Sequence, residues 1–398
     1  MSREKRVEII REIERKRGSK VIAYVTSDRQ NLSVPIESDV ISIIHNHILA
    51  LGKTDDIKLD LFIYSRGGQS DVPWTIVSMF REYAKKGSFS VLIPYRAHSA
   101  ATVISLGADE IIMTQKAELG PIDITIGSGP YNPIDKDSHK RLPISVEDVR
   151  GYFSLLEKIG CVEPEERMQG FELLTNNVHP LALGTVSRLL EETKVVGLRL
   201  LSTRAKPFSK SQNQKIIKAL SSEVFSHGHT INRTEARRYI QLKHVKDAEA
   251  YNIDNELWEL YKEYMDLFKL EEPYKPEEYL IVNDLENYTW DDLNLACVES
   301  IGRFDICRTN MRVIRLRKVP PQINLNLNNM TFPVISIPNI PAGFNQQQIE
   351  ALIQQVVSTI IQQSLNNATQ AVVQQLLRSL PQAGFERISY NSGWKKES

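Results

Sequence analysis

A regular alternation of short apolar runs with amphipathic segments constrains the fold of this chain more than any other feature. Four runs have the composition of buried strands: KVIAYVT (20–26), KLDLFIYS (58–65), SFSVLIPY (88–95) and DEIIMT (109–114). Apolar residues at helical spacing fill the segments between them, which are 35–52, 71–87 and 98–108. This alternation predicts an α/β fold with a largely parallel sheet packed by helices, in which chemistry gathers at the carboxyl ends of the strands.

Composition and charge argue against several classes of protein. The 398 residues are 41% hydrophobic and 25% charged, as in ordinary soluble globular proteins. The formal net charge is zero, so overall electrostatics give no support to a general nucleic-acid role, and no nucleic-acid partner is expected. The sequence has no run of about 18 apolar residues, and a membrane span is therefore not expected.

The cysteines and the N-terminal segment indicate a reducing compartment. Cys161, Cys297 and Cys307 have no C-x-x-C spacing, which predicts neither a disulfide framework nor a zinc site. The first 20 residues are charged and helical in pattern, and they lack the apolar segment of a secretory signal. The simplest prediction is a cytoplasmic protein without a metal or another cofactor.

Shifts in composition divide the chain into three predicted regions. Residues 1–250 carry the alternation, and residues 251–318 are charged and aromatic, which predicts a helix, a Pro-containing linker and a small α+β unit. Lysine is absent between Lys318 and Lys395, and this marks 319–398 as a third region with a β-hairpin and a long amphipathic helix. The Gln-rich and Asn-rich polar face of that helix favours subunit assembly or docking of a protein partner. Intramolecular packing and membrane-surface binding are the alternatives.

Two polar features follow neighbouring strands of the predicted sheet. Gly67 and Gly68 come after the run 58–65, and Ser99 begins the helical segment that follows the run 88–95. A tight turn explains one glycine more easily than two, whereas a Gly pair can also present backbone N–H groups to a developing negative charge, as an oxyanion hole does. Helix capping would explain Ser99 alone, but its placement at the same sheet edge as the Gly pair favours a nucleophile.

Seven short motifs stand in order between about residues 17 and 245. They are RGSKVIAYV, LFIYSRGGQS, VLIPYRAHSAATVISLGADEIIM, AELGPIDITIG, LPISVEDVRGYF, VHPLALGTVSRLL and HGHTINRTEARRYIQL. In this order they resemble the serine dehydrogenase proteinase family of signal-peptide-peptidase-A-like peptidases, within the Clp-protease/crotonase superfamily. Each motif is weak alone, and the ordered set is specific; the C-terminal 150 residues carry no motif recognised as belonging to this resemblance.

The resemblance implies a repeated β-β-α spiral core, here with a C-terminal extension, that stacks into trimeric or hexameric homo-oligomeric rings. It also implies ATP-independent hydrolysis of polypeptide substrates through an acyl-enzyme. Carried over by position, Ser99 is the nucleophile, and the amides of Gly67 or Gly68, with that of Ala100, form the oxyanion hole. Arg66 stands where the family has a proline, which leaves the loop conformation and the donors open.

The resemblance identifies the general base that would activate Ser99 less clearly than it identifies the nucleophile. Clp subunits place a histidine in the interval that here reads GPIDITIG (120–127), which contains none; LGPID (119–123) is expected to line the substrate. Peptidases of the signal-peptide-peptidase-A type use a lysine just before a segment like LPISVEDV. This implies Lys140, 41 residues after Ser99, as the first candidate and Lys136 as the second. Such a lysine must be neutral at work, which burial favours.

Histidines are the competing candidates for the base. His229 lies in a segment that resembles the one where Clp subunits place their aspartate, and it is the strongest of them. His98 adjoins the serine, although neighbouring side chains usually diverge, and His139 shares the loop of the candidate lysines. His179 has the position of a helix-start or contact residue. His227 and His229 lack a third ligand at suitable spacing, so no metal site is predicted.

Three functions compete at this stage. The first is the ring-forming serine peptidase, with a Ser-Lys dyad. The second is a catalytically inactive scaffold that keeps the fold and assembles or recruits partners through its C-terminal helix. The third is an acyl-CoA-handling crotonase-like enzyme, which would need a pair of glutamates where only Glu118 is near the motifs. The Gly pair and the positioned serine favour the peptidase.

Overall fold

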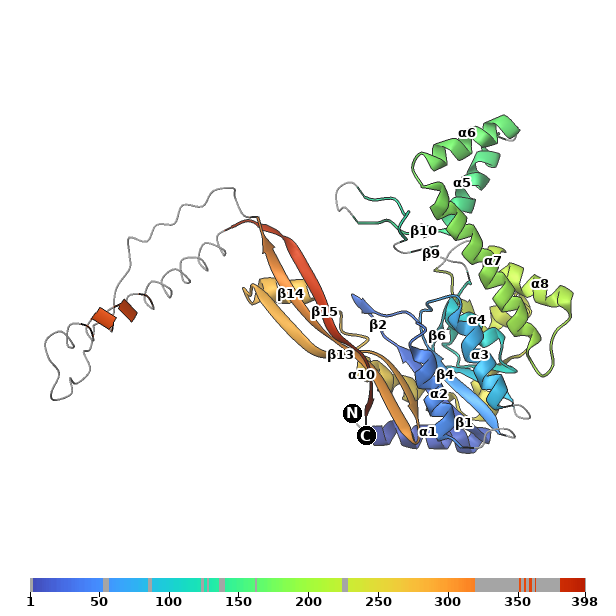
Figure 1. Cartoon of the computed structure of the whole chain (residues 1–398). Coiled ribbons are helices and arrows are strands. Elements are labelled where there is room, and N and C mark those ends of the chain that lie inside the picture. The colour runs from blue at the N-terminus through green and yellow to red at the C-terminus, as the bar shows by residue number, and fades with distance from the viewer. Residues whose placement is uncertain are drawn as a thin grey trace. The chain divides into compact units, whose positions relative to one another are not determined.

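Figure 1 shows the helices and strands of the computed structural model. The chain divides into two compact units. Unit 1 comprises Met1–Tyr274, Asp292–Thr309 and Asn391–Ser398, and unit 2 comprises Lys275–Asp291 and Asn310–Tyr390. The structure describes residues 3–52, 57–84, 88–122, 125–126, 129–135, 140–161, 163–223, 228–318, 351, 354–355, 358–359, 362 and 380–397.

A mixed sheet forms the centre of unit 1. Its parallel part has the strand order β12-β7-β5-β4-β1, and β13 continues it antiparallel to β1, followed by β14 and β15. These strands are β1 (Ser19–Thr26), β4 (Lys58–Tyr64), β5 (Phe89–Ile93), β7 (Glu110–Met113), β12 (Val245–Asp247), β13 (Asn287–Ser300), β14 (Arg303–Arg317) and β15 (Gln382–Glu397). The four apolar runs of the sequence are β1, β4, β5 and β7, and the predicted α/β fold is confirmed.

Helices cover both faces of the sheet because its central strands are apolar on both sides. In β1, Val21, Ala23 and Val25 face one core, and Ile22 and Tyr24 face the other. The first face packs against α1 (Arg3–Arg17) and α10 (Asp254–Phe268). The second packs against α2 (Val40–Ala50), α3 (Val72–Tyr83), α4 (Ala100–Leu106), α7 (Pro180–Ser202) and α8 (Lys210–Lys218).

Shorter elements surround the sheet. A three-stranded sheet has the order β11-β8-β6, and two further pairs join β9 to β10 and β2 to β3. These strands are β2 (Asp28–Arg29), β3 (Leu32–Ser33), β6 (Arg96–Ala97), β8 (Glu118–Leu119), β9 (Thr125–Ile126), β10 (Ile144–Ser145) and β11 (Ile231–Asn232). The remaining helices of unit 1 are α5 (Val146–Lys158), α6 (Pro164–Thr175), the π-helical turn η1 (Ala219–Glu223), α9 (Arg233–Arg238) and the 3₁₀ turn η2 (Ala248–Tyr251).

Unit 2 contains α11 (Pro276–Val282) and the outer segments of β13, β14 and β15. An aromatic cluster ties the helix to β13, and it consists of Tyr279, Tyr288 and Trp290. Ion pairs join Arg317 to Glu286 and Arg387 to Glu277. Throughout the described residues of both units, no helix is long and apolar enough to cross a membrane.

The structure divides the chain at different points from those that composition suggests. The predicted boundary at 250 falls inside unit 1, because α10 packs its apolar face on the sheet with α1. The predicted small α+β unit at 251–318 is not separate either, since β13 pairs directly with β1. The predicted hairpin at the start of 319–398 and most of the predicted long helix lie outside the described residues, whereas the end of that region forms β15.

A buried histidine gives the fold a testable pH dependence. His47 on α2 is fully buried, with Nδ1 2.8 Å from Ser300 Oγ and Nε2 2.9 Å from Asp305 Oδ2. Burial lowers the pKa of His47 to about 4; Asp305 opposes this shift, and Arg303 and Arg3 add to it.

We expect stability to fall with pH between about 6.5 and 4, because the unfolded chain takes up a proton there that folded His47 does not. The free energy of unfolding should drop by about 3 kcal/mol more in the wild type than in His47→Gln, over that interval. Urea unfolding at pH 7, 5.5 and 4 measures this, and equal pH dependence in the two proteins would contradict it.

Candidate active site

Two loops meet at the carboxyl edge of the main sheet. One follows β4 and the other follows β5, and these strands are parallel neighbours. An isolated bridge joins Ser65 to Ala97: Ser65 N donates to Arg96 O and His98 N donates to Ser65 O, both at 3.0 Å. The Gly pair and Ser99 come directly after this bridge, and the structure therefore brings them together.

Ser99 has a strained backbone and does not cap its helix. Its φ and ψ are 50° and −116°, a region that residues with a side chain rarely adopt. It occupies the N-cap position of α4, yet its side chain accepts no capping hydrogen bond. The simple explanation of Ser99 as a helix cap therefore fails, and a strained turn between strand and helix is the usual way to expose a nucleophile.

Gly67 allows the two loops to approach more closely than a side chain would permit. It has a φ of 107°, and a Cβ atom built on it would lie 2.6 Å from Ser99 Cβ and 3.1 Å from Ala100 N. Gly68 is equally confined on its other side, since its Cβ would lie 2.1 Å from the backbone oxygen of Ile36. Both glycines are therefore required by close backbone contacts, and a positive φ adds to the requirement at Gly67.

The backbone N–H groups of Gly68 and Ala100 donate no hydrogen bond to any of the described residues. Gly67 N donates to Ser65 Oγ at 3.0 Å, so this amide is already occupied. Among the described residues, no hydrogen bond is recorded from the amides of Gly68 and Ala100, the latter being the first residue of α4. Of the amides that the sequence suggested as oxyanion donors, the geometry therefore favours Gly68 and Ala100.

Ser99 lines a cavity of unit 1 of about 1230 Å³. The loops after β1 and β4 form one side of it, and α7 forms another. Its lining residues near Ser99 are Gly67, Gly68, Ala100, Val103, Ile122, Leu189 and Thr193, with Arg66, Arg188 and Glu192 as charged neighbours. Ile122 belongs to the segment expected to line the substrate. The cavity is large enough for a peptide segment.

Arg66 turns away from the glycines that follow it. Its side chain is 54% exposed, and Nε lies 2.9 Å from Asp28 Oδ2. The same carboxylate oxygen accepts from Arg96 at 3.0 Å, and Asp28 Oδ1 accepts from the Tyr64 hydroxyl at 2.6 Å. Asp28 therefore compensates the charge of Arg66, and the arginine leaves the Gly67–Gly68 peptide unobstructed.

His98 lies close to Ser99 in sequence but has a different partner. Its Nε2 is 3.1 Å from Glu118 Oε1, although not in hydrogen-bond geometry, and its ring packs over Gly120. Burial lowers the pKa of His98, and Arg66 adds to this shift while Glu118 opposes it. His98 is absent from the lining of the Ser99 cavity.

The structure does not bring the predicted base Lys140 to Ser99. Lys140 is exposed, its carbonyl accepts from Asp135 N at 2.8 Å, and an isolated bridge joins Ile134 to Arg141. It therefore lies on a hairpin between β9 and β10, and it is absent from the lining of the cavity. The alternatives Lys136 and His139 lie outside the described residues.

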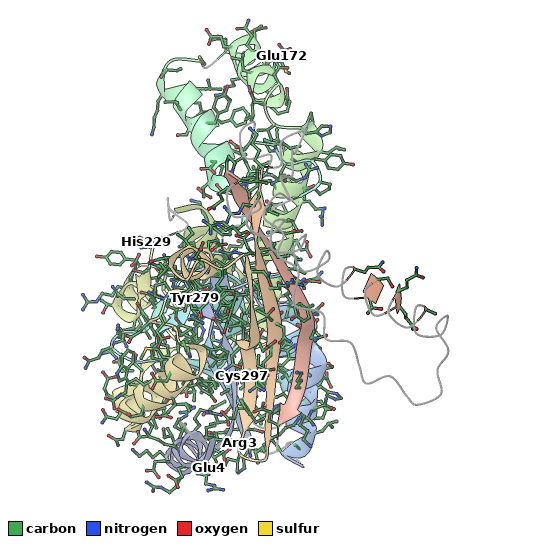
Figure 2. All side chains as sticks on the ribbon, turned by 90° about the vertical axis from the view of Figure 1, so that its left-hand side faces the viewer. Arg3, Glu4, Glu172, His229, Tyr279 and Cys297 are labelled. Carbon is green, nitrogen blue, oxygen red and sulfur yellow. The ribbon has the colours of Figure 1, made fainter. Side chains whose placement is uncertain are left out.

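His229 is also remote from the serine. It lies at the surface, 43% exposed, with Nε2 2.8 Å from Glu235 Oε1 (Figure 2). Ile231, two residues after His229, pairs with Leu119, which pairs with Ala97, so two strand spacings of about 5 Å each separate Ile231 from Ala97. His229 is absent from the lining of the Ser99 cavity. His227 lies outside the described residues.

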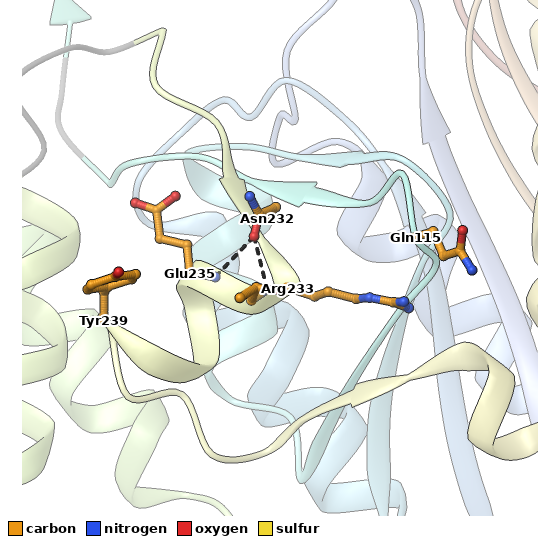
Figure 3. Close-up of a pocket in the computed structure, with 6 residues that line it drawn as sticks. Gln115, Asn232, Arg233, Glu235 and Tyr239 are labelled. Atoms are coloured by element: carbon orange, nitrogen blue, oxygen red, sulfur yellow. Dashed lines mark hydrogen bonds between the residues drawn. The ribbon is translucent and has the colours of Figure 1, made fainter.

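A second cavity, of about 580 Å³, is lined by Glu235, the partner of this histidine; Figure 3 shows its lining residues. Its lining residues are Gln115, Asn232, Arg233, Thr234, Glu235 and Tyr239. Asn232 Oδ1 accepts from the amides of Thr234 and Glu235, at 3.0 Å each, and so caps α9. This second cavity contains a helix cap rather than a reactive group, and it is separate from the Ser99 cavity.

Two further sequence candidates have structural roles. His179 begins α7 as predicted: its Nδ1 accepts from Leu181 N at 3.2 Å and its ring stacks on Tyr131. Glu118, the carboxylate weighed for thioester chemistry, pairs with Arg96 at 3.1 Å and does not line the cavity. Among the described residues, no group of three or more His, Cys, Asp or Glu is placed to hold a metal ion.

The structure also identifies residues that the motifs did not suggest. Ser65 accepts from the Gly67 amide and from Thr26, and Ile36 bonds to the backbone of Gly67 and Gln69. Residues of α7 line the same cavity. Ser65 immediately precedes Arg66 and the Gly pair, so the motif contained this residue but gave no sign of its contact. Nothing in the local sequence could have paired Thr26 or α7 with the site.

Residues 1–157 match the family described as ClpP-like SDH-type serine proteinase. The resemblance drawn from the motifs, and the ClpP-like fold that it implied, are therefore confirmed over these residues. The matched part contains both loops of the cavity edge, with Gly67, Gly68, Ser99 and Ala100. It ends within α5, so the family match does not include α7 or anything after it.

Two proteins of one organism are similar to part of this chain. The uncharacterized protein MJ1495 of Methanocaldococcus jannaschii is 39% identical over 132 residues, which are 32% of this chain and 44% of that protein. The uncharacterized protein MJ0137 of the same organism is 30% identical over 135 residues, 33% of this chain and 46% of that protein. The chain thus spans less than half the length of each relative.

Two solved structures are similar at low identity. One is a mutant of the 1510-N membrane-bound stomatin-specific protease in complex with a substrate peptide, with 14% identity and a TM-score of 0.33 over 57% of this chain and 76% of that chain. The other is ClpP1 from Listeria monocytogenes, with 14% identity and a TM-score of 0.31 over 60% of this chain and 94% of that chain. Scores of this size establish no common arrangement of the complete chains.

We expect Gly67→Ala and Gly68→Ala to disrupt the junction of the two loops. The added methyl group collides with Ser99 Cβ in the first variant and with the Ile36 backbone in the second, so each should lower the midpoint of thermal unfolding by several degrees. Gly184→Ala, on α7, is the matched control: it has open space around it and should be neutral or slightly stabilising. Equal midpoints in all three variants would contradict the close contact.

Proposed function

We propose that this chain is a serine peptidase that cleaves polypeptides through an acyl-enzyme on Ser99, without ATP. The observation that carries the proposal is the geometry of Ser99, which is strained, uncapped and in contact with Gly67 at the edge of a large cavity. The family match over residues 1–157 supports the same chemistry. We include assembly into a homo-oligomeric ring of three or six copies in the proposal.

In the proposed reaction, Ser99 Oγ attacks the carbonyl carbon of the scissile peptide bond. Negative charge then develops on the carbonyl oxygen, and the amides of Gly68 and Ala100 stabilise it. A base takes the hydroxyl proton and delivers it to the leaving amine, and a water molecule then hydrolyses the acyl-enzyme by the same steps. Fixed backbone donors suit this task because they need no reorganisation during the reaction.

Lys140 is the base that we propose for the acylating form. A lysine acts as a base only when neutral, and burial in the cavity would favour that form. Because Lys140 is exposed on the hairpin between β9 and β10, the proposal requires this hairpin to approach Ser99 when substrate or a second copy of the chain binds.

A second candidate function is a scaffold without peptidase activity. The observation in its favour is that the described residues lining the Ser99 cavity include neither histidine nor lysine. In that case the fold would assemble or recruit partners through the region 319–398. The acyl-CoA-handling alternative is weaker, because Glu118 is engaged by Arg96 away from the cavity.

An alkyl fluorophosphonate probe distinguishes the peptidase from the scaffold. We expect the full-length chain to be labelled at Ser99 and Ser99→Ala to lose all labelling. The control is Ser105→Ala, which removes a buried hydroxyl that bonds Ala101 O inside α4, and it should retain labelling. If the wild type stays unlabelled at high protein and probe concentration, the scaffold is correct.

The same probe tests the base. Lys140→Ala should slow labelling by at least about a hundredfold, since an unactivated serine hydroxyl is a weak nucleophile. Lys136→Ala and His229→Ala should label at close to the wild-type rate. The Ser-Lys dyad is wrong if Lys140→Ala is labelled as fast as these two controls.

The predicted assembly role of the C-terminal region can be tested without disturbing β15. Lys318 N donates to Pro381 O at 2.8 Å, so the ends of the intervening segment lie side by side, and a short Gly-Ser linker can replace residues 320–379. We expect the shortened chain to form an oligomer of fewer copies than the full chain, measured as molar mass by light scattering. Its circular dichroism should show that the rest of the chain is still folded. An unchanged oligomer would show that this segment does not drive assembly.

A further inference from the structure

The orientation of one peptide plane decides whether the Gly loop can stabilise an oxyanion. Gly67 O accepts a hydrogen bond from Ile36 N at 2.7 Å, and Gln69 N donates to Ile36 O at 2.9 Å. In a trans peptide, the N–H group points opposite to the C=O group. Because the Gly67 carbonyl points to Ile36, the Gly68 N–H of the same peptide points away from Ile36.

A hydroxyl group fixes the preceding peptide of this loop. Ser65 Oγ accepts from Gly67 N at 3.0 Å, and Ser65 is 1% exposed. Together with the Ile36 bond, this contact occupies both the N–H and the C=O of Gly67. Gly67 at a φ of 107° has wide conformational freedom, so these bonds help to hold the loop in the form that presents Gly68 N–H.

A second buried hydroxyl positions the first. Thr26 Oγ1, at the end of β1, donates to Ser65 Oγ at 2.8 Å, and Thr26 is also 1% exposed. Ser65 Oγ thus accepts two hydrogen bonds, which matches its two lone pairs and fixes the side chain. The chain of contacts runs from Thr26 through Ser65 to the amide of Gly67.

We propose that Ser65 and Thr26 are positioning residues for the reaction at Ser99, which hold the Gly67–Gly68 peptide so that Gly68 N–H faces the developing oxyanion. Neither residue touches the substrate, since neither lines the cavity. Loss of either hydroxyl lets the peptide rotate about Gly67 and removes one donor from the transition state. This inference rests on the proposed function for its kinetic consequence, but not for the contact itself.

Kinetics of fluorophosphonate labelling test the role of the two hydroxyls. Ser65→Ala and Thr26→Val should lower the maximal inactivation rate constant about tenfold or more, with the half-saturating probe concentration unchanged, because an oxyanion donor acts on the transition state. Ser65→Thr and Thr26→Ser keep the hydroxyls and should stay within about threefold of the wild type. Ser105→Ala, the matched loss of a buried hydroxyl, should also stay within about threefold.

Hydrogen exchange followed by mass spectrometry supplies a readout that needs no activity. Peptides containing residues 65–69 should take up deuterium faster in Ser65→Ala and Thr26→Val than in the wild type. In Ser65→Ala the Gly67 amide loses its hydrogen-bond acceptor, and in Thr26→Val that acceptor, Ser65 Oγ, is no longer fixed by Thr26. In Ser105→Ala the uptake of this segment should not change.

The outcomes separate the two proposals. Wild-type labelling with equally fast labelling of Ser65→Ala and Thr26→Val overturns the positioning role, and unchanged exchange in both variants overturns the contact. If the wild type is not labelled but hydrogen exchange changes as expected, the proposed function is wrong, and the hydrogen bonds from Thr26 and Gly67 to Ser65 are supported. If Ser65→Ala does not fold, the near-isosteric Thr26→Val carries both measurements.

Discussion

The backbone bridge between Ser65 and Ala97 is the constraint on which the rest of the site depends. Strands β4 and β5 are parallel neighbours, but their pairing ends before the loops begin. Beyond the last pair, two hydrogen bonds of 3.0 Å join Ser65 to Arg96 and His98 around Ala97 of β6, and so hold the two loops together. Directly after this bridge Gly67 contacts Ser99, so two separate strand ends form one candidate site.

The strain at Ser99 is kept in place by the packing around it. A backbone in this region costs on the order of 1–3 kcal/mol and persists only where the surroundings fix it. Here the apolar residues of α4 are buried against the sheet. Thr102 Oγ1 donates to Ala97 O at 2.7 Å and accepts from Gly120 N at 3.1 Å. These contacts anchor both ends of the Ser99 turn, so the strain is a stable property of the fold.

Arg66 shows how the loop accommodates a departure from the family pattern. A proline at this position would fix φ without any partner, whereas arginine brings a charge and a flexible side chain. Asp28 forms an ion pair with Arg66 and also accepts hydrogen bonds from Tyr64 and Arg96. This cluster restrains Arg66 where a proline ring would restrain the backbone. The glycines that follow keep their close contacts with Ser99 and Ile36.

Several elements were predictable because their signals are local. Buried parallel strands read as continuous apolar runs, and this is why β1, β4, β5 and β7 could be located from composition alone. The strands β13, β14 and β15 were missed because they are partly exposed, so their side chains show no such run, and because β13 joins β1 from a distant part of the sequence. The same reason explains why the boundaries at 250 and 318 do not match the compact units.

The sequence by itself determined that a diglycine and a serine follow adjacent strands, and hence that a backbone donor and a hydroxyl share one sheet edge. Only the tertiary structure decided which amides remain available, since hydrogen bonds from Gly67 to Ser65 and from Ile36 to Gly67 join groups whose contact no local pattern encodes. It also decided that Lys140 and His229 lie outside the cavity. The position of a loop depends on the packing of the whole chain, whereas the end of a strand depends mainly on its own residues.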